Sequence, residues 1–114
     1  MVVEDDGETR EALAELLEDN GYVVVAVENG QQALAQLRER PHVRAIVVDV
    51  VMPVMNGATF RGEQLADPAL ASIPLILLSG RDDIDFMANA LGAAACLRKP
   101  LVGDALLRVL ERYR

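Results

Sequence analysis

Residues that can do chemistry follow four separate apolar stretches of the chain. Glu4 and Asp5 follow the first of these stretches, Asp49 the second, Ser79 the third and Lys99 the fourth. Unit charges about 4 Å apart repel by about 4 kcal/mol at an effective dielectric of 20, so clustered carboxylates either bind protons or capture a cation. The chain has one histidine and one cysteine, and carboxylate oxygens are hard ligands. This donor set favours Mg²⁺ or Mn²⁺ over zinc.

A carboxylate beside a divalent cation, an ammonium group and a hydroxyl is suited to phosphoryl transfer. The cation and Lys99 would neutralise the transferring group, and Asp49 is the candidate nucleophile. Each of these residues also has an ordinary structural explanation. The acidic residues after the first stretch are favourable at a helix N-terminus. Ser79-Gly80 is a common loop sequence, and Asp49 could simply end a strand. The joint placement of the pieces favours a shared site.

Strand and helix patterns alternate five times along the chain. Short apolar runs rich in β-branched residues predict strands, and apolar residues at helical spacing predict helices. The predicted strands are 2–3, 22–27, 45–48, 75–78 and 94–97, and the predicted helices are 8–20, 31–40, 58–65, 83–91 and 104–113.

This alternation predicts an α/β fold with a doubly wound, five-stranded parallel sheet and helices on both faces. The flavodoxin-like strand order 2-1-3-4-5 suits a chain of this length, and ligands then bind outside the carboxyl ends of the strands, near the first and third. We expect a single domain over residues 1–114. Because the first predicted strand begins directly after Met1, we also expect it to be trimmed at its N-terminal end.

The composition argues against several classes of function. The formal net charge is -7 and no basic cluster is present, which argues against nucleic-acid binding by this chain. No apolar run approaches the ~18 residues of a membrane span. With a single cysteine, Cys96, no disulfide can form within the chain, and the reducing cytoplasm is the expected compartment.

Four motifs, taken in order, make the sequence recognisable. They are VVEDD, VVDVVMPVMNG, LLSG and LRKPL, each at the end of a predicted strand. Over essentially its whole length the chain resembles the receiver domain of two-component response regulators. The resemblance implies that Asp49 is the phosphoacceptor, that the Ser79 hydroxyl turns toward the phosphoryl group, and that Lys99 pairs with it.

The resemblance also implies a metal site. Asp5 would bind Mg²⁺ directly, Glu4 would act largely through water, and Asp49 and the backbone carbonyl of Val51 would complete the protein ligands. Mn²⁺ is expected to substitute. No other cofactor is implied.

A receiver domain is a phosphorylation switch rather than an enzyme with turnover. The resemblance implies that a sensor histidine kinase or a histidine phosphotransferase donates the phosphoryl group, in a phosphorelay or a simple two-component pathway. We expect a monomer or a weak, phosphorylation-dependent dimer. The sequence departs from its relatives at Cys96, where an aromatic ring is frequent, and a thiol cannot swing between outward and inward rotamers as that ring does.

Two alternatives remain at the level of the sequence. One is a Mg²⁺-dependent phosphatase of the haloacid dehalogenase type, which also uses an aspartate nucleophile at a strand end. That family normally has a second Asp two residues later, where this chain has Val51. The other is an interaction module that is never phosphorylated, against which the intact set of site residues argues.

Overall fold

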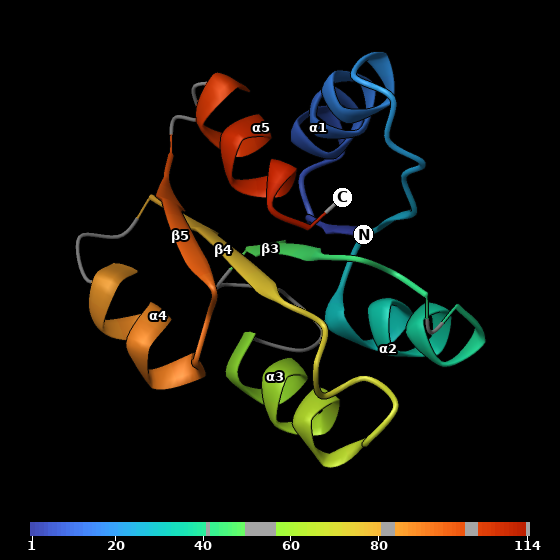
Figure 1. Cartoon of the computed structure of the whole chain (residues 1–114), viewed down its shortest axis with the longest axis vertical. Helices are drawn as coiled ribbons and strands as arrows, with labels where there is room; N and C mark the ends of the chain where they lie inside the picture. The colour runs from blue at the N-terminus through green and yellow to red at the C-terminus, as the bar shows by residue number, and fades with distance from the viewer. Residues whose placement is uncertain (41, 50–56, 81–83, 100–102, 114) are drawn as a thin grey trace.

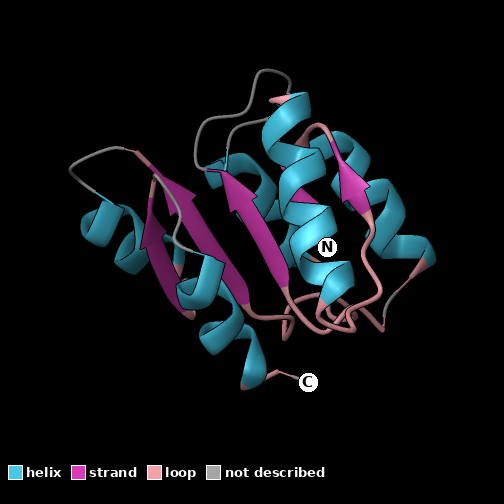
Figure 2. Ribbon diagram, turned by 90° about the horizontal axis from the view of Figure 1, so that it is seen from above, coloured by secondary structure: helices cyan, strands magenta, loops and turns pink. Residues whose placement is uncertain are grey.

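The fold is a five-stranded parallel sheet covered by helices on both faces (Figures 1 and 2). The structure is a computed structural model that describes residues 1–40, 42–49, 57–80, 84–99 and 103–113. Its strands are β1 (Val2–Val3), β2 (Ala26–Val27), β3 (Ile46–Asp49), β4 (Leu75–Ser79) and β5 (Ala95–Arg98). Its helices are α1 (Gly7–Asp19), α2 (Gly30–Glu39), α3 (Gly57–Ala66), α4 (Ile84–Leu91) and α5 (Gly103–Glu111).

The strand order β2-β1-β3-β4-β5, with every pairing parallel, confirms the predicted topology. Neighbouring residues of a strand point to opposite faces of a sheet, and the core divides accordingly. Val48 and Leu77 pack on the face covered by α2, α3 and α4, whereas Val47 and Ile76 pack on the face covered by α1 and α5. The strands are therefore buried on both sides, as their continuous apolar sequences predict.

The predicted strand 22–27 is wrong over its first four residues. Only Ala26 and Val27 pair with β1, opposite Val2 and Val3, and the side chain of Val23 is 96% exposed. Residues 22–25 have the composition of a strand, but β1 offers them no partner beyond the bond from the Val2 N–H to the Val25 carbonyl. Composition alone does not make a strand where a neighbouring backbone is lacking.

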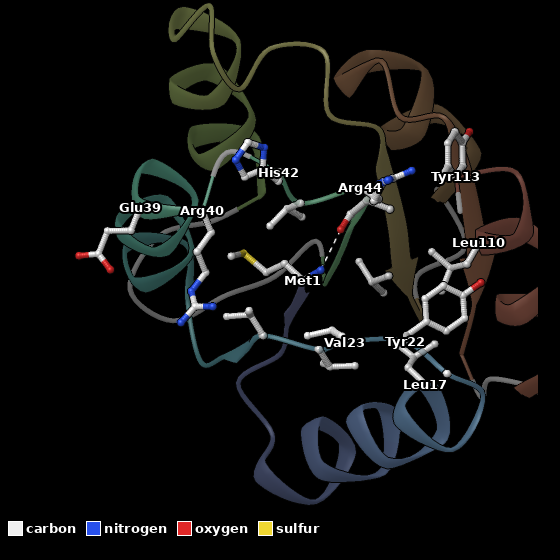
Figure 3. A pocket seen from close by; sticks show the side chains of 16 residues that line it. Met1, Leu17, Tyr22, Val23, Glu39, Arg40, His42, Arg44, Leu110 and Tyr113 are labelled. Atoms are coloured by element: carbon white, nitrogen blue, oxygen red, sulfur yellow. Dashed lines mark hydrogen bonds between the residues drawn. The ribbon is translucent and has the colours of Figure 1, made fainter.

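These residues instead line a pocket of about 670 Å³ at the amino ends of the strands (Figure 3). Tyr22 and Val23 lie on one side of the pocket and Arg44 on another, while the backbone nitrogen of Met1 donates to the Ala45 carbonyl at 2.8 Å. Of the predicted site residues whose side chains the structure describes, Glu4, Asp5, Ser79 and Lys99, none lines this pocket. It lies at the edge of the sheet opposite to the one where the chemistry is predicted.

Two glycines end helices as the sequence predicts. Gly21 after α1 has φ 87° and Gly92 after α4 has φ 65°, a region that side chains disfavour. After α1, the Gly21 N–H donates to the Glu18 carbonyl and the Tyr22 N–H donates to the Leu17 carbonyl. This paired arrangement is the Schellman motif, which satisfies carbonyls that a helix end would otherwise leave open.

Gly62, in contrast, lies inside α3, is exposed, and a Cβ atom built on it meets no atom within 4 Å. We expect Gly62→Ala to raise the free energy of unfolding by about 0.5–1 kcal/mol, because alanine restricts the unfolded chain and clashes with nothing. Urea denaturation measures the change. Gly92→Ala is the matched control and should destabilise, since its φ is unfavourable for alanine; a gain in stability for both variants would contradict this explanation.

Candidate functional site

The carboxyl ends of four strands meet at one edge of the sheet. β3 ends at Asp49 and β4 ends at Ser79, while Glu4 and Lys99 directly follow β1 and β5. In the pairing of β3 with β4, Asp49 lies opposite Leu78, the residue before Ser79. The backbone thus brings the four predicted positions to the same edge, as parallel strands require.

An ion pair joins the two outer positions of this edge. The ammonium nitrogen of Lys99 lies 3.3 Å from Oε2 of Glu4, although the residues are 95 positions apart in the sequence. Glu4 is only 1% exposed, and a buried carboxylate is costly unless it is paired and hydrogen-bonded. Its Oε1 also accepts a longer bond of 3.4 Å from the Asp6 N–H. Lys99 is therefore aimed into the site.

The backbone around Glu4 is held as well. Its N–H donates to the Val27 carbonyl at 3.1 Å, and its carbonyl accepts a bond of 3.0 Å from the Arg10 guanidinium. Arg10 also lies 3.7 Å from the Glu28 carboxylate. These contacts fix the end of β1 against the start of α1 and the loop after β2.

The acidic residues 5 and 6 have different surroundings from Glu4. Both are exposed, but Asp6 is the N-cap of α1 and accepts bonds from the hydroxyl of Thr9 and, at 3.2 Å, from the Thr9 N–H. The hydroxyl contact is the main reason that the pKa of Asp6 lies below its ordinary value. The helix-cap explanation therefore applies to Asp6, and Asp5 is the exposed acid beside Glu4.

Ser79 is buried at the end of β4, and its carbonyl accepts a 2.9 Å bond from the Lys99 N–H. This bond extends the pairing of β4 with β5 by one residue and fixes the backbone from which the lysine side chain starts. Ser79 at the end of β4 and Lys99 directly after β5 are therefore neighbours at this edge of the sheet.

The metal site stays a prediction. The side chain of Asp49 is not described, and Val51 lies outside the described residues. Among the residues that are described, no three His, Cys, Asp or Glu side chains form a group able to hold a metal ion. The donors at hand, the carboxylates of Glu4 and Asp5, are nevertheless the hard oxygen ligands that Mg²⁺ prefers.

Cys96 is half-buried in β5 and packs against the core. Its thiol donates to Oδ1 of Asp85 in α4 at 3.3 Å. Burial, reinforced by this neighbouring carboxylate, raises the pKa of the thiol. The thiol is thus kept neutral, and it contacts the first turn of α4.

Comparison with known proteins identifies the family of this chain. The sequence matches the response regulator receiver domain over residues 1–111. The chain belongs to the receiver domain family. It is accordingly a signalling domain of two-component systems rather than a classical enzyme, and a histidine kinase or phosphotransfer protein is the kind of partner that it implies.

Individual relatives agree with this family. The chain is 37% identical to the response regulator receiver protein Anae109_2439 of Anaeromyxobacter over 97% of its own length and 45% of the relative's. It is 30% identical to protein PilH of Pseudomonas aeruginosa over 97% and 93% of the two lengths. Chemotaxis protein CheY4 of Vibrio cholerae superimposes with a TM-score of 0.89 at 29% identity, covering 99% of this chain and 95% of that one.

The chain spans less than half the length of several curated relatives, including Anae109_2439 and, at 43%, the CpxR homolog of Haemophilus influenzae. In the part of the receiver domain that the structure describes, a helix able to cross a membrane is not found.

The buried ion pair makes Lys99 important for stability. Lys99→Met should lower the free energy of unfolding by about 1–3 kcal/mol without added metal, because the Glu4 carboxylate loses its ammonium partner. The lysine is 30% exposed, which keeps the value below that of a fully buried pair.

Urea denaturation tests this expectation, with Arg38→Met, on the exposed face of α2, as the control. Adding Glu4→Gln to the Lys99→Met protein should restore part of the loss, because the amide carries no charge. Equal losses for Lys99→Met and Arg38→Met would contradict the explanation.

Proposed function

We propose that this receiver domain is a phosphorylation switch in which Asp49 accepts a phosphoryl group from a histidine kinase or a histidine phosphotransferase. The observation that carries the proposal is the pairing of Lys99 with buried Glu4 at the strand end beside Asp49. It supports a site that already holds an ammonium group where phosphoryl charge would arrive.

The reaction needs only one bond made and one broken. A carboxylate oxygen of Asp49 attacks phosphorus, and the bond between phosphorus and the donor histidine nitrogen breaks. The electron pair returns to the imidazole, which can take up a proton from water. Lys99 would then exchange Glu4 for a phosphoryl oxygen, and the Ser79 hydroxyl would donate to another.

A divalent cation would be held by Glu4, Asp5, Asp49 and the Val51 carbonyl, as the donor chemistry of Glu4 and Asp5 allows. When bound, Mg²⁺ supplies positive charge that neutralises the phosphoryl oxygens. Without it, the acidic residues repel each other and an incoming phosphoryl group, so we propose that phosphorylation depends on Mg²⁺, with Mn²⁺ able to replace it.

The proposed cellular compartment follows from the proposed kinase partner. A kinase that uses ATP acts in the cytoplasm, and the single free cysteine is compatible with that reducing compartment. We propose a single receiver domain over residues 1–114, acting as a monomer or as a weak dimer that forms on phosphorylation. Nucleic-acid contact would belong to a partner or to another domain, because this chain is acidic.

We expect acetyl phosphate and Mg²⁺ to add one phosphoryl group to the protein, and Asp49→Asn to abolish the adduct because the amide is not a nucleophile. Intact mass spectrometry measures the adduct. Asp6→Asn is the matched control, since asparagine also caps helices well and labelling should persist. Undiminished labelling of the Asp49→Asn protein would overturn the assignment, and steady turnover of a phosphate monoester would favour a phosphatase instead.

We expect Mg²⁺ to raise the thermal stability of the domain, since a ligand that binds only the native state stabilises it, by about 2.7 kcal/mol at a hundredfold excess over Kd. Asp5→Asn should weaken Mg²⁺ binding and stabilise the metal-free protein, because it removes a charge that repels Glu4. Calorimetric titration and melting curves test both effects, with exposed Glu11→Gln on α1 as control. Unaltered Mg²⁺ affinity in Asp5→Asn would exclude this aspartate from the metal site.

A further inference from the structure

An arginine is buried where α3 meets the C-terminal end of α4. Arg61 is 9% exposed, and its Nε donates to the Leu91 carbonyl at 2.8 Å. Its Nη2 donates to the Gly92 carbonyl at 3.0 Å. These two carbonyls belong to the last residue of α4 and the residue that follows it.

The same helix end carries its own backbone motif. With Gly92 at φ 65°, the Gly92 N–H donates to the Asn89 carbonyl at 3.2 Å and the Ala93 N–H donates to the Ala88 carbonyl at 2.9 Å. This is a second Schellman motif. Backbone groups therefore satisfy the carbonyls of residues 88 and 89, and Arg61 satisfies those of residues 91 and 92.

Gln64 continues the connection from α3 to the segment before β4. It is 0% exposed, and its Oε1 accepts a bond of 2.8 Å from Nη1 of Arg61. Its Nε2 donates to the carbonyls of Leu70 and Ile73, each at 3.0 Å. Both amide protons of Gln64 are thus used, and five hydrogen bonds join α4, α3 and the segment between α3 and β4.

The charge on Arg61 is balanced in an unusual way. Among the described residues no carboxylate forms an ion pair with it. The positive guanidinium instead lies at the C-terminal end of α4, where the helix dipole is negative. Burial lowers the pKa of Arg61, yet an arginine stays charged in proteins. Loss of the carbonyl partners of Arg61 would therefore leave a buried charge poorly solvated.

The first turn of α4 is tied to the neighbouring strand differently. There the Cys96 thiol donates to Asp85 at 3.3 Å, in an exposed environment. A thiol is a weak donor, so this bond costs less to break than the buried bonds of Arg61. Ile84 in the same turn also packs in the core. In the side-chain hydrogen bonds of the described residues, the C-terminal end of α4 is therefore the more strongly held.

We propose that Arg61 and Gln64 form a clamp that fixes the C-terminal end of α4 to α3, so that any response of α4 to phosphorylation is confined to its first turns. The clamp itself is independent of the proposed function, whereas the confinement rests on it. In this arrangement the residues around Gly92 act as the fixed end of α4, and the surface near Asp85 and Cys96 is the part that changes.

Amide hydrogen exchange on the metal-free protein tests the clamp. In Arg61→Met the Gly92 and Ala93 amides should exchange at least tenfold faster than can be accounted for by the change in global stability, which urea denaturation measures separately. Arg38→Met, on the exposed face of α2, is the control and should leave them unchanged. Unaltered protection of Gly92 and Ala93 in Arg61→Met would overturn the clamp.

Gln64→Glu provides a second variant in case Arg61→Met does not fold. The carboxylate still accepts from Arg61 but can no longer donate to the carbonyls of Leu70 and Ile73. Exchange should then increase at the Ile73 amide, which bonds to the Leu70 carbonyl at 3.1 Å, while Gly92 and Ala93 stay protected. Loss of protection at Gly92 and Ala93 with none at Ile73 would contradict the assigned roles.

The confinement is tested with beryllofluoride and Mg²⁺, which mimic the phosphorylated state. In the parent protein the mimic should alter exchange at Asp85 and Phe86 but not at Gly92 and Ala93, and in Arg61→Met the change should spread to the latter pair. A change at Gly92 and Ala93 in the parent would overturn the confinement. If the mimic altered amide exchange at none of these residues, both the proposed function and the confinement would be contradicted. The comparison of the parent and Arg61→Met proteins without metal would still test the clamp.

Discussion

A carboxylate that is almost fully removed from water has to be compensated, and the rest of the site depends on how this is done for Glu4. The fold places Lys99, from the opposite end of the chain, against it. This ion pair links the residues that follow β1 and β5, between which β3 and β4 lie in the sheet. The ion pair thus spans the two strands that carry Asp49 and Ser79. It connects the two sides of the site before any ligand binds.

The same contact keeps the positively charged ammonium group of Lys99 in the site. An acidic domain with a net charge of -7 would otherwise repel a phosphoryl donor. Lys99 is partly exposed on one side and paired on the other, so its ammonium group can change partners without being carried across the protein. In the switch proposed above, charge would therefore be redistributed among groups that are already in place.

Much of this could be predicted from the sequence because the rules involved are local. Apolar β-branched runs predicted the strands, and the parallel arrangement fixed which residues meet at one edge. Two features could not be predicted. Residues 22–25 have the composition of a strand, but pairing depends on the partner backbone. Arg61 and Gln64 have the residue types of an exposed helix face. Only the structure shows that both are buried, Arg61 at the end of α4 and Gln64 against the segment between α3 and β4.

The shortness of β2 has a further consequence for how molecules of this protein meet one another. β2 is the edge strand of the sheet, and the run from Tyr22 to Val27 contains no charge, proline or glycine. Such a segment at a sheet edge is a template for strand addition between molecules. Asp19 and Glu28, which flank the run, have the position of charged gatekeepers that oppose this association. We therefore expect association between molecules at high concentration to begin at the side of the sheet where β2 lies, and these two charges to oppose it.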